Sequence, residues 1–137
     1  MYGRSSMAYL DVIIVLALAQ FIFLGIKVGS ARGKFGVAAP AITGNPAFER
    51  VFRVHQNTLE QLIVFVPACY GFFHYWKDPE WLILIPGLVF IIGRFMYSSS
   101  YSKDAAKRGP GFILTILSNV FLILGTFIGA LKSLAMG

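Results

Sequence analysis

Residues 49–66 read ERVFRVHQNTLEQLIVFV, and this stretch decides how the chain folds. Its first half is rich in polar side chains and its second half is apolar, with no turn signal between the two. The polar half, leaving glutamines aside, contributes Glu49, Arg50, Arg53, His55, Asn57 and Glu60. A continuous pattern of this kind indicates one helix that carries charge into the start of a membrane span.

The composition of the whole chain supports a membrane setting. Of its 137 residues, 57% are hydrophobic and only 13% are charged, and the mean hydropathy is +0.72. A soluble domain of this length cannot bury so much apolar surface. The net charge of +6 does not indicate a nucleic-acid partner, because the basic residues lie beside apolar runs. The single cysteine, Cys69, excludes an internal disulfide and offers no metal cluster.

Four stretches are suited to cross a bilayer as helices, and they cover residues 8–26, 57–76, 81–97 and 112–131. The first has 19 residues, which at about 1.5 Å each span roughly 28 Å, close to the hydrocarbon thickness. A cleaved signal peptide is the alternative for this stretch, but its length and the three spans that follow favour a membrane helix. We therefore predict an all-α integral membrane protein, a four-transmembrane-helix bundle forming one domain over residues 1–137.

The connections predict where the helices begin and end. Only KDPE separates the second and third spans, so Asp78 is predicted to cap the third helix with Pro79 at its first position. Asn45 and Pro46 are predicted to start the second helix in the same way. The third helix is predicted to continue beyond its span until the Gly-Pro pair at 109–110 ends it.

Basic residues are distributed unevenly between the two ends of such a bundle. The end with the first and third connections holds Lys27, Arg32, Lys34, Arg50, Arg53, Arg94, Lys103, Lys107 and Arg108. The other end holds Arg4, Lys77 and Lys132. Because positive residues favour the cytosolic side, we expect the long connections in the cytosol and both termini outside or in the lumen.

Two helices are expected to present a polar stripe in their cytosolic halves. On the second helix, Arg53, Asn57 and Glu60 recur at i, i+4 and i+7 and share one face, and Arg50 lies on the same side one turn earlier. On the third helix, the stripe comprises Arg94, Tyr97, Tyr101 and Arg108. Charges at membrane depth cost about 2.5–3.5 kcal/mol each, so several on one face need partners. An interhelical network is one interpretation, but four arginines against one carboxylate favour an anionic ligand.

Other functional classes find little support in the sequence. No second histidine or acid stands at metal-ligating spacing from His74, and neither a Gly-rich phosphate loop nor a serine-nucleophile motif occurs. A small four-span multidrug exporter has a similar length and hydropathy. Such exporters use an acidic residue deep in the first span, however, whereas Asp11 lies near the end of that span.

Two segments resemble the MAPEG family, the membrane-associated proteins of eicosanoid and glutathione metabolism. They are SARGKFGVAAPAITGNPAFERVFRVHQNTLE, residues 30–60, and GRFMYSSSYSKDAAKRGPGF, residues 93–112. The resemblance is greatest to the branch that holds microsomal glutathione S-transferases and the leukotriene-forming glutathione synthase. It implies a homotrimer of four-helix subunits that binds glutathione as co-substrate between neighbouring subunits on the cytosolic side.

The resemblance also implies roles for individual residues. The implied glutathione ligands are Arg32, Arg53, His55, Asn57, Glu60, Gln61, Tyr97 and Tyr101. Arg108 stands at the position of the arginine thought to activate the thiol and is the implied catalytic residue. Two positions depart from the family pattern: Gln61 stands where an aromatic residue is usual, and Gly33 where a second basic residue is common.

These residue types suit the chemistry of glutathione, which carries two carboxylates, one ammonium group and a thiol. Arginines suit the carboxylates, and Glu60 suits the ammonium group. A free thiol has a pKa of about 8.5, and lowering it by two units requires about 2.7 kcal/mol. One guanidinium at about 4 Å, with an effective dielectric constant near 20, supplies about 4 kcal/mol before desolvation. A single arginine is therefore sufficient in magnitude.

The implied function is a membrane-bound glutathione transferase that attacks lipophilic electrophiles, with reduction of lipid hydroperoxides as a further activity. Its second substrate is expected to arrive from the membrane lipid along apolar side chains such as Phe112 and Leu114. The alternative is a non-catalytic protein that presents a lipid, of the lipoxygenase-activating type found in the same family. The enzyme is favoured because the set Arg53, Asn57, Glu60, Tyr97, Tyr101 and Arg108 is complete.

Overall fold

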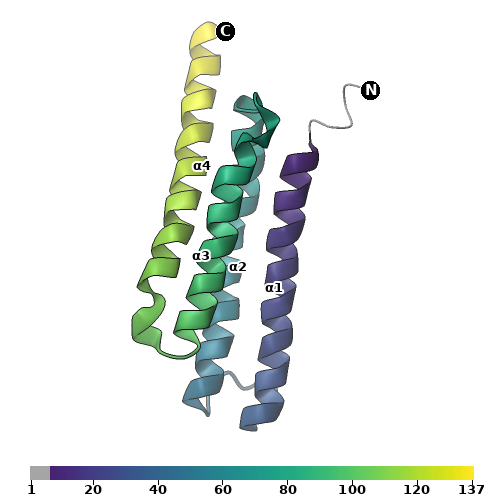
Figure 1. Ribbon diagram of the computed structural model, residues 1–137, viewed down its shortest axis with the longest axis vertical. Coiled ribbons are helices and arrows are strands. Elements are labelled where there is room, and N and C mark those ends of the chain that lie inside the picture. The colour runs from purple at the N-terminus through teal and green to yellow at the C-terminus, as the bar shows by residue number, and fades with distance from the viewer. Residues whose placement is uncertain (1–6) are drawn as a thin grey trace.

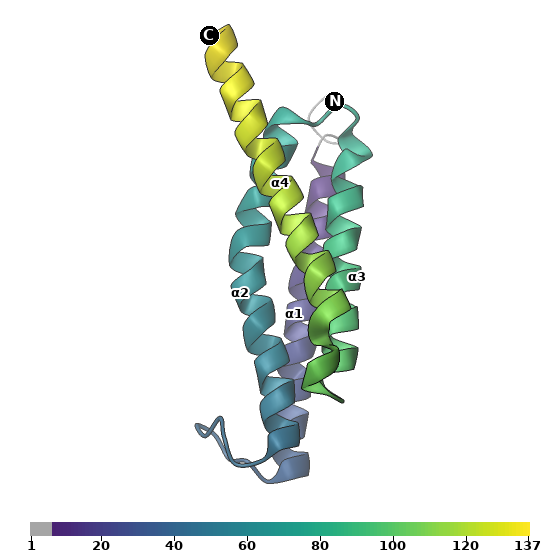
Figure 2. The ribbon, with the colours of Figure 1, turned by 90° about the vertical axis from the view of Figure 1, so that its left-hand side faces the viewer.

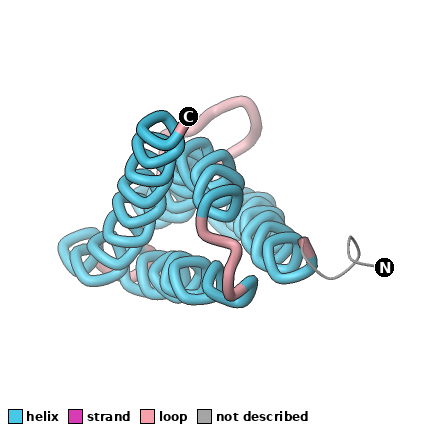
Figure 3. Tube along the Cα trace, turned by 90° about the horizontal axis from the view of Figure 1, so that it is seen from above, coloured by secondary structure: helices cyan, strands magenta, loops and turns pink. Residues whose placement is uncertain are grey.

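The computed structural model describes residues 7–137 and is entirely helical between its loops. Its elements are α1 (Ala8–Phe35), α2 (Pro46–Tyr75), η1 (Glu80–Ile83), α3 (Leu84–Tyr101), η2 (Ala105–Arg108) and α4 (Gly109–Met136), where η marks a 3-10 helix. The four α-helices stand side by side, with the α1–α2 and α3–α4 connections at one end (Figures 1 and 2). The α2–α3 connection and the C-terminus lie at the other end. Seen along the bundle, the loops join the helices at their ends (Figure 3). The predicted four-helix bundle is confirmed.

The start of α2 follows the predicted capping pattern. The side-chain oxygen of Asn45 accepts hydrogen bonds from the backbone N–H groups of Ala47 (2.9 Å) and Phe48 (3.1 Å). These bonds satisfy donors that the first turn of a helix otherwise leaves free. From this cap α2 runs without a break to Tyr75, so the polar and apolar halves of residues 49–66 form one helix.

The predicted end of the third helix is wrong. α3 ends at Tyr101, and the side chain of Asp104 accepts a hydrogen bond from the N–H of Ala106 (3.0 Å). Asp104 thereby caps the new helix η2, because a short acidic side chain competes for the backbone donors that follow it. Gly109, which was predicted to stop a helix, begins α4 instead.

The predicted start of the third helix is wrong as well. Pro79 has an extended backbone (φ −78°, ψ 148°) and occupies the cap position of η1, where no side chain caps the helix. Because Pro79 is extended, the first helical residue is Glu80, and Asp78 lies one position too early to act as the cap.

The outer surface of the bundle is apolar. Ile22 and Ile63, for example, are 64% and 67% exposed, which suits contact with lipid chains and not with water. Three described segments are long and apolar enough to cross a membrane, namely Ala8–Phe35, Glu80–Tyr101 and Ala105–Met136. α2 has a comparable length of 30 residues but carries more polar side chains, so its span stays a prediction. The chain is an integral membrane protein.

Two contacts fix the neighbours of α3 inside the bundle. Phe65 of α2 stacks on Phe90 of α3 with ring centroids 3.8 Å apart, and both rings are fully buried. The side chain of Gln20 on α1 donates a hydrogen bond to the carbonyl of Ile91 on α3 (3.0 Å). A polar group buried in this way needs such a partner. Gln20 therefore links α1 to α3.

α3 and α4 approach so closely that their backbones touch. A Cβ atom added at Gly111 would overlap the backbone nitrogen of Tyr97 and lie 2.7 Å from its Cα. A Cβ atom added at Gly93 would lie 3.0 Å from the backbone nitrogen of Thr115. Small residues permit this approach, as in other membrane helix pairs. The contact places Tyr97 beside the first turn of α4.

Candidate active site

A polar groove of about 480 Å³ is formed where α2, α3, η2 and α4 meet. Its lining residues are Arg53, Asn57, Tyr97, Tyr101, Arg108 and Phe112. All of these except Phe112 were predicted from the sequence as glutathione-binding or catalytic residues, and Phe112 was expected to border the path of the second substrate. Residues from distant parts of the chain therefore come together in one place, as the two polar stripes predicted.

On the α2 side of the groove, Glu60 is bonded through both of its oxygens. Arg53 Nη1 lies 3.1 Å from Glu60 Oε1, and both side chains are about half exposed. Asn57 Nδ2 donates to Glu60 Oε2 over 3.4 Å. An ion pair this exposed contributes only about 0–1 kcal/mol to stability. Arg53 and Glu60 can thus exchange partners with a charged ligand at little cost.

On the α3 side, aromatic rings form one wall of the groove. Tyr97 and Tyr101 stack with centroids 5.3 Å apart and an interplanar angle of 10°. The ring of Phe112, from the first turn of α4, lies 6.4 Å from that of Tyr97. The wall joins polar hydroxyl groups to an apolar surface, so it can contact a peptide and a lipophilic molecule together.

Arg108 reaches the groove from η2. It does not extend a stripe along α3 as predicted, because the chain reverses direction around Asp104. Arg108 Nη1 donates to the carbonyl of Ala105 over 3.0 Å, and the side chain is exposed. A guanidinium group has five N–H donors. One internal bond therefore leaves most of them for an anion in the groove.

Arg94 was named in the α3 stripe, but no role was assigned to it from the sequence. It is fully buried, with 0% exposure. Its Nη2 atom donates to Asn57 Oδ1 over 2.9 Å, and its guanidinium carbon lies 4.2 Å from the ring centroid of Tyr97. A buried cation thus joins two groove residues. The signal in the sequence was a charge within an apolar run, three residues before Tyr97.

Two predicted ligands pack against other helices of the same chain. The ring of His55 stacks on Phe21 of α1 with centroids 4.4 Å apart. The side-chain oxygen of Gln61 accepts a hydrogen bond from Asn119 of α4 over 3.1 Å. The structure does not bring these two side chains to the groove.

Arg32 also lies outside the groove. Its Nη1 atom donates to the carbonyls of Val37 (3.3 Å) and Ala41 (2.6 Å), both in the first connection. Its guanidinium carbon lies 4.9 Å from the ring centroid of Phe48. Within one chain, these contacts fold the first connection back onto the end of α1.

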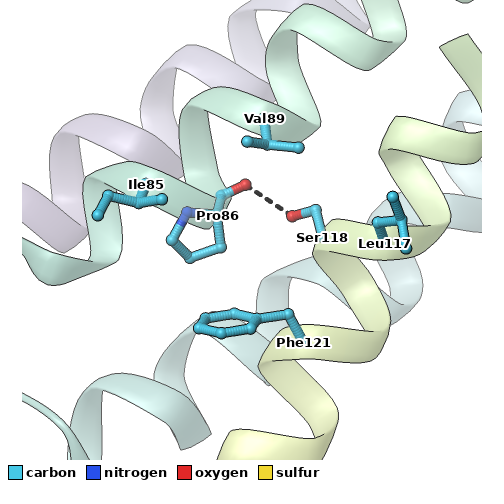
Figure 4. Close-up of a pocket in the computed structure, with 6 residues that line it drawn as sticks. All are labelled: Ile85, Pro86, Val89, Leu117, Ser118 and Phe121. Atoms are coloured by element: carbon cyan, nitrogen blue, oxygen red, sulfur yellow. Dashed lines mark hydrogen bonds between the residues drawn. The ribbon is translucent and has the colours of Figure 1, made fainter.

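A second groove, of about 210 Å³, lies between α3 and α4 nearer to the start of α3 (Figure 4). It is lined by Ile85, Pro86, Val89, Leu117, Ser118 and Phe121. The hydroxyl of Ser118 donates to the carbonyl of Pro86 over 2.6 Å, so this polar group is satisfied within the protein. The groove therefore presents an apolar surface that suits a lipophilic molecule.

The sequence is similar to those of known proteins along most of its length. Residues 10–128 match the sequence model of the MAPEG family. The chain is 41% identical to Uncharacterized protein sll1147 of Synechocystis sp., over 96% of this chain and 94% of that protein. It is 38% identical to Microsomal glutathione S-transferase 2 of Homo sapiens, over 96% of this chain and 84% of that protein. It is 30% identical to Leukotriene C4 synthase of Bos taurus, over 77% and 69% respectively. These matches confirm the resemblance noted in the sequence, and the chain belongs to the MAPEG family.

Proposed function

We propose that this protein is a membrane-bound glutathione transferase that ionises the glutathione thiol for attack on lipophilic electrophiles. The observation that carries the proposal is the polar groove, where five predicted site residues from α2, α3 and η2 converge. The similarity to Microsomal glutathione S-transferase 2 supports glutathione as the co-substrate.

The charge of the groove suits the thiolate form of glutathione. Arg53 and Arg108 at the groove and Arg94 behind it carry three positive charges. Glu60 carries one negative charge, so two positive charges are in excess. Glutathione has two carboxylates and one ammonium group, so ionising its thiol leaves it with two net negative charges. Nearby positive charge favours the ionised form of such a thiol.

Arg108 is the residue that supplies positive charge to the sulfur in this proposal. Its bond to the carbonyl of Ala105 restrains the guanidinium beside the groove. The thiol proton leaves to water, and the thiolate remains beside Arg108. No protein side chain has to act as a general base, because solvent accepts the proton.

The thiolate then attacks the second substrate. With an aryl halide, a carbon–sulfur bond forms, the carbon–halogen bond breaks and halide leaves. With a lipid hydroperoxide, two glutathione molecules are oxidised to the disulfide, and the hydroperoxide is reduced to an alcohol and water. The apolar groove between α3 and α4 and the ring of Phe112 offer a route for this substrate from the bilayer.

We further propose that the protein works as a homotrimer with its long connections and polar groove on the cytosolic side. Nine of the 12 basic residues lie toward the end that holds those connections, which favours this orientation. A site shared between subunits would also explain why Arg32 does not reach the groove of its own chain. In that arrangement Arg32 would come from a neighbouring subunit.

A turnover assay on the purified, detergent-solubilised protein tests the proposal. We expect glutathione-dependent conjugation of 1-chloro-2,4-dinitrobenzene, followed by absorbance, and we expect no product with S-methylglutathione, whose sulfur is blocked. Reduction of a fatty-acid hydroperoxide, measured separately, decides whether peroxidase activity is also present. A protein that binds fatty acid but forms no product with either electrophile would be a lipid-presenting protein, and the proposed transferase would be ruled out.

A further inference from the structure

Arg94 is the largest side chain in the described part of the chain that is fully buried. A charged group removed from water is costly unless it is paired and hydrogen-bonded. Within residues 7–137, however, neither Nε nor Nη1 of Arg94 has a hydrogen-bond partner. Its contacts are the bond from Nη2 to Asn57 Oδ1 and the stacking on Tyr97. Because burying Arg94 is costly for stability and Arg94 contacts two groove residues, we expect it to have a role in the site.

The bond to Arg94 determines how the amide of Asn57 is turned. A guanidinium group can only donate hydrogen bonds, so it must face the amide oxygen. The NH₂ group of Asn57 then points the other way, where it donates to Glu60 Oε2 over 3.4 Å. Glu60 Oε1 is bonded to Arg53 (3.1 Å). A chain of contacts therefore runs from the buried cation through Asn57 to the carboxylate of Glu60, which lies beside the groove residues Asn57 and Arg53.

We propose that Arg94 is a positioning residue that, through Asn57, holds the carboxylate of Glu60 ready for the ammonium group of glutathione. This inference rests on the proposed function. An ionised carboxylate accepts at about four lone-pair positions, and Asn57 and Arg53 use one position on each oxygen. The remaining positions can accept the N–H groups of an ammonium ion. Glu60 is an acidic side chain bonded to two of the residues that line the groove, so it would repel the ligand's carboxylates and select its amino end.

Removing Arg94 should release Asn57. Without Arg94 the amide of Asn57 is no longer held in one orientation, so its NH₂ group no longer keeps Glu60 Oε2 in a fixed position. Glu60 would then be held by Arg53 alone, an exposed contact. The arginines that attract the two carboxylates of glutathione would remain. The expected result is a specific loss of preference for the ligand's amino group, and not a uniform loss of binding.

The test compares two ligands, glutathione and its analogue with the amino group replaced by hydrogen, by calorimetry on the solubilised oligomer. For the wild type we expect the analogue to bind at least tenfold more weakly. For Arg94→Met, the ratio of the affinity for glutathione to the affinity for the analogue should fall below about twofold. Arg94→Lys, which still only donates, should restore a ratio of at least fivefold. If Arg94→Met does not yield a folded oligomer, Arg94→Gln replaces it, because its amide can donate or accept and so does not fix Asn57.

The outcomes separate this inference from the function on which it rests. If the wild type binds no glutathione, the proposed function fails and the role of Arg94 fails with it. If the wild type binds both ligands equally, or if the folded Met or Gln variant keeps the full ratio, glutathione binding stands and the positioning role is overturned. Loss of the ratio in Arg94→Lys as well as in Arg94→Met would also overturn it, because the constraint on Asn57 is the same with either cation.

Discussion

Lys107 and Arg108 are neighbours in η2, and both side chains are exposed, but only Arg108 lines the groove. This difference provides a matched pair of variants that remove the same charge. In Arg108→Ala the pKa of bound glutathione thiol should rise by about two units, toward the value of about 8.5 for a free thiol. The thiolate fraction at pH 7 should therefore fall more than tenfold, while glutathione binding weakens less.

The measurement is the ultraviolet absorbance of the thiolate, titrated against pH in detergent. In wild type the thiolate should persist down to about pH 6.5 and disappear below it, because a lowered pKa keeps the sulfur ionised to lower pH. Lys107→Ala should titrate like the wild type. An Arg108→Ala titration curve that overlays the wild-type curve would show that another group ionises the thiol.

Among the site residues, the sequence predicted those that regular helices bring together and missed those that tertiary contacts bring together. Arg53 and Asn57 lie one turn apart on α2, and so do Tyr97 and Tyr101 on α3, so helical spacing was enough to group each pair. The burial of Arg94 depends on how α2 and α3 pack against each other. That packing cannot be read from either helix alone.

Among the elements, the contact between α3 and α4 holds one wall of the groove in place. In Gly111→Ala the new methyl group would overlap the backbone of Tyr97, so α4 must move away from α3. Overpacking of this kind costs about 1–3 kcal/mol. We expect a melting temperature several degrees below that of the wild type, measured by tryptophan fluorescence during heating in detergent.

Gly29→Ala is the control for this prediction. Gly29 lies in α1, and a Cβ atom added there meets no atom within 4 Å. Alanine favours a helix over glycine by up to about 1 kcal/mol, so this variant should melt at the wild-type temperature or above it. If Gly111→Ala melts like Gly29→Ala, the two helices do not need their close approach.

The boundaries of the elements show why local signals succeed or fail. Asn45 followed by Pro46 is a strong start signal with no competing pattern, and the helix begins there. Residues 98–108, in contrast, contain helix-forming residues around Asp104, so the sequence favoured a continuous helix. The structure instead uses the Asp104 side chain as a cap, which moves Arg108 off α3 and toward α4.

For the whole molecule, hydropathy and length were enough to predict a membrane bundle of four helices. Three described segments meet the length and hydropathy of a membrane span, and α2 is not among them. α2 is also the helix that carries the groove residues Arg53 and Asn57. Among the four α-helices of the described residues, the one proposed to contact glutathione is thus the one that does not meet the criteria of a membrane span. Binding a charged ligand requires polar side chains on that helix, whereas insertion into a membrane favours apolar ones.

The proposed activity depends on a groove with excess positive charge that binds glutathione and keeps its sulfur ionised. The most direct test is isothermal titration calorimetry of glutathione into the purified protein at pH 7, in two buffers with different ionisation enthalpies. The difference between the binding enthalpies in the two buffers, divided by the difference between the ionisation enthalpies of the buffers, gives the number of protons released on binding. A thiol pKa lowered by two units, from about 8.5, predicts release of about 0.7 proton per glutathione bound, and none with S-methylglutathione. Absence of binding heat in both buffers, or binding without proton release, would contradict the account.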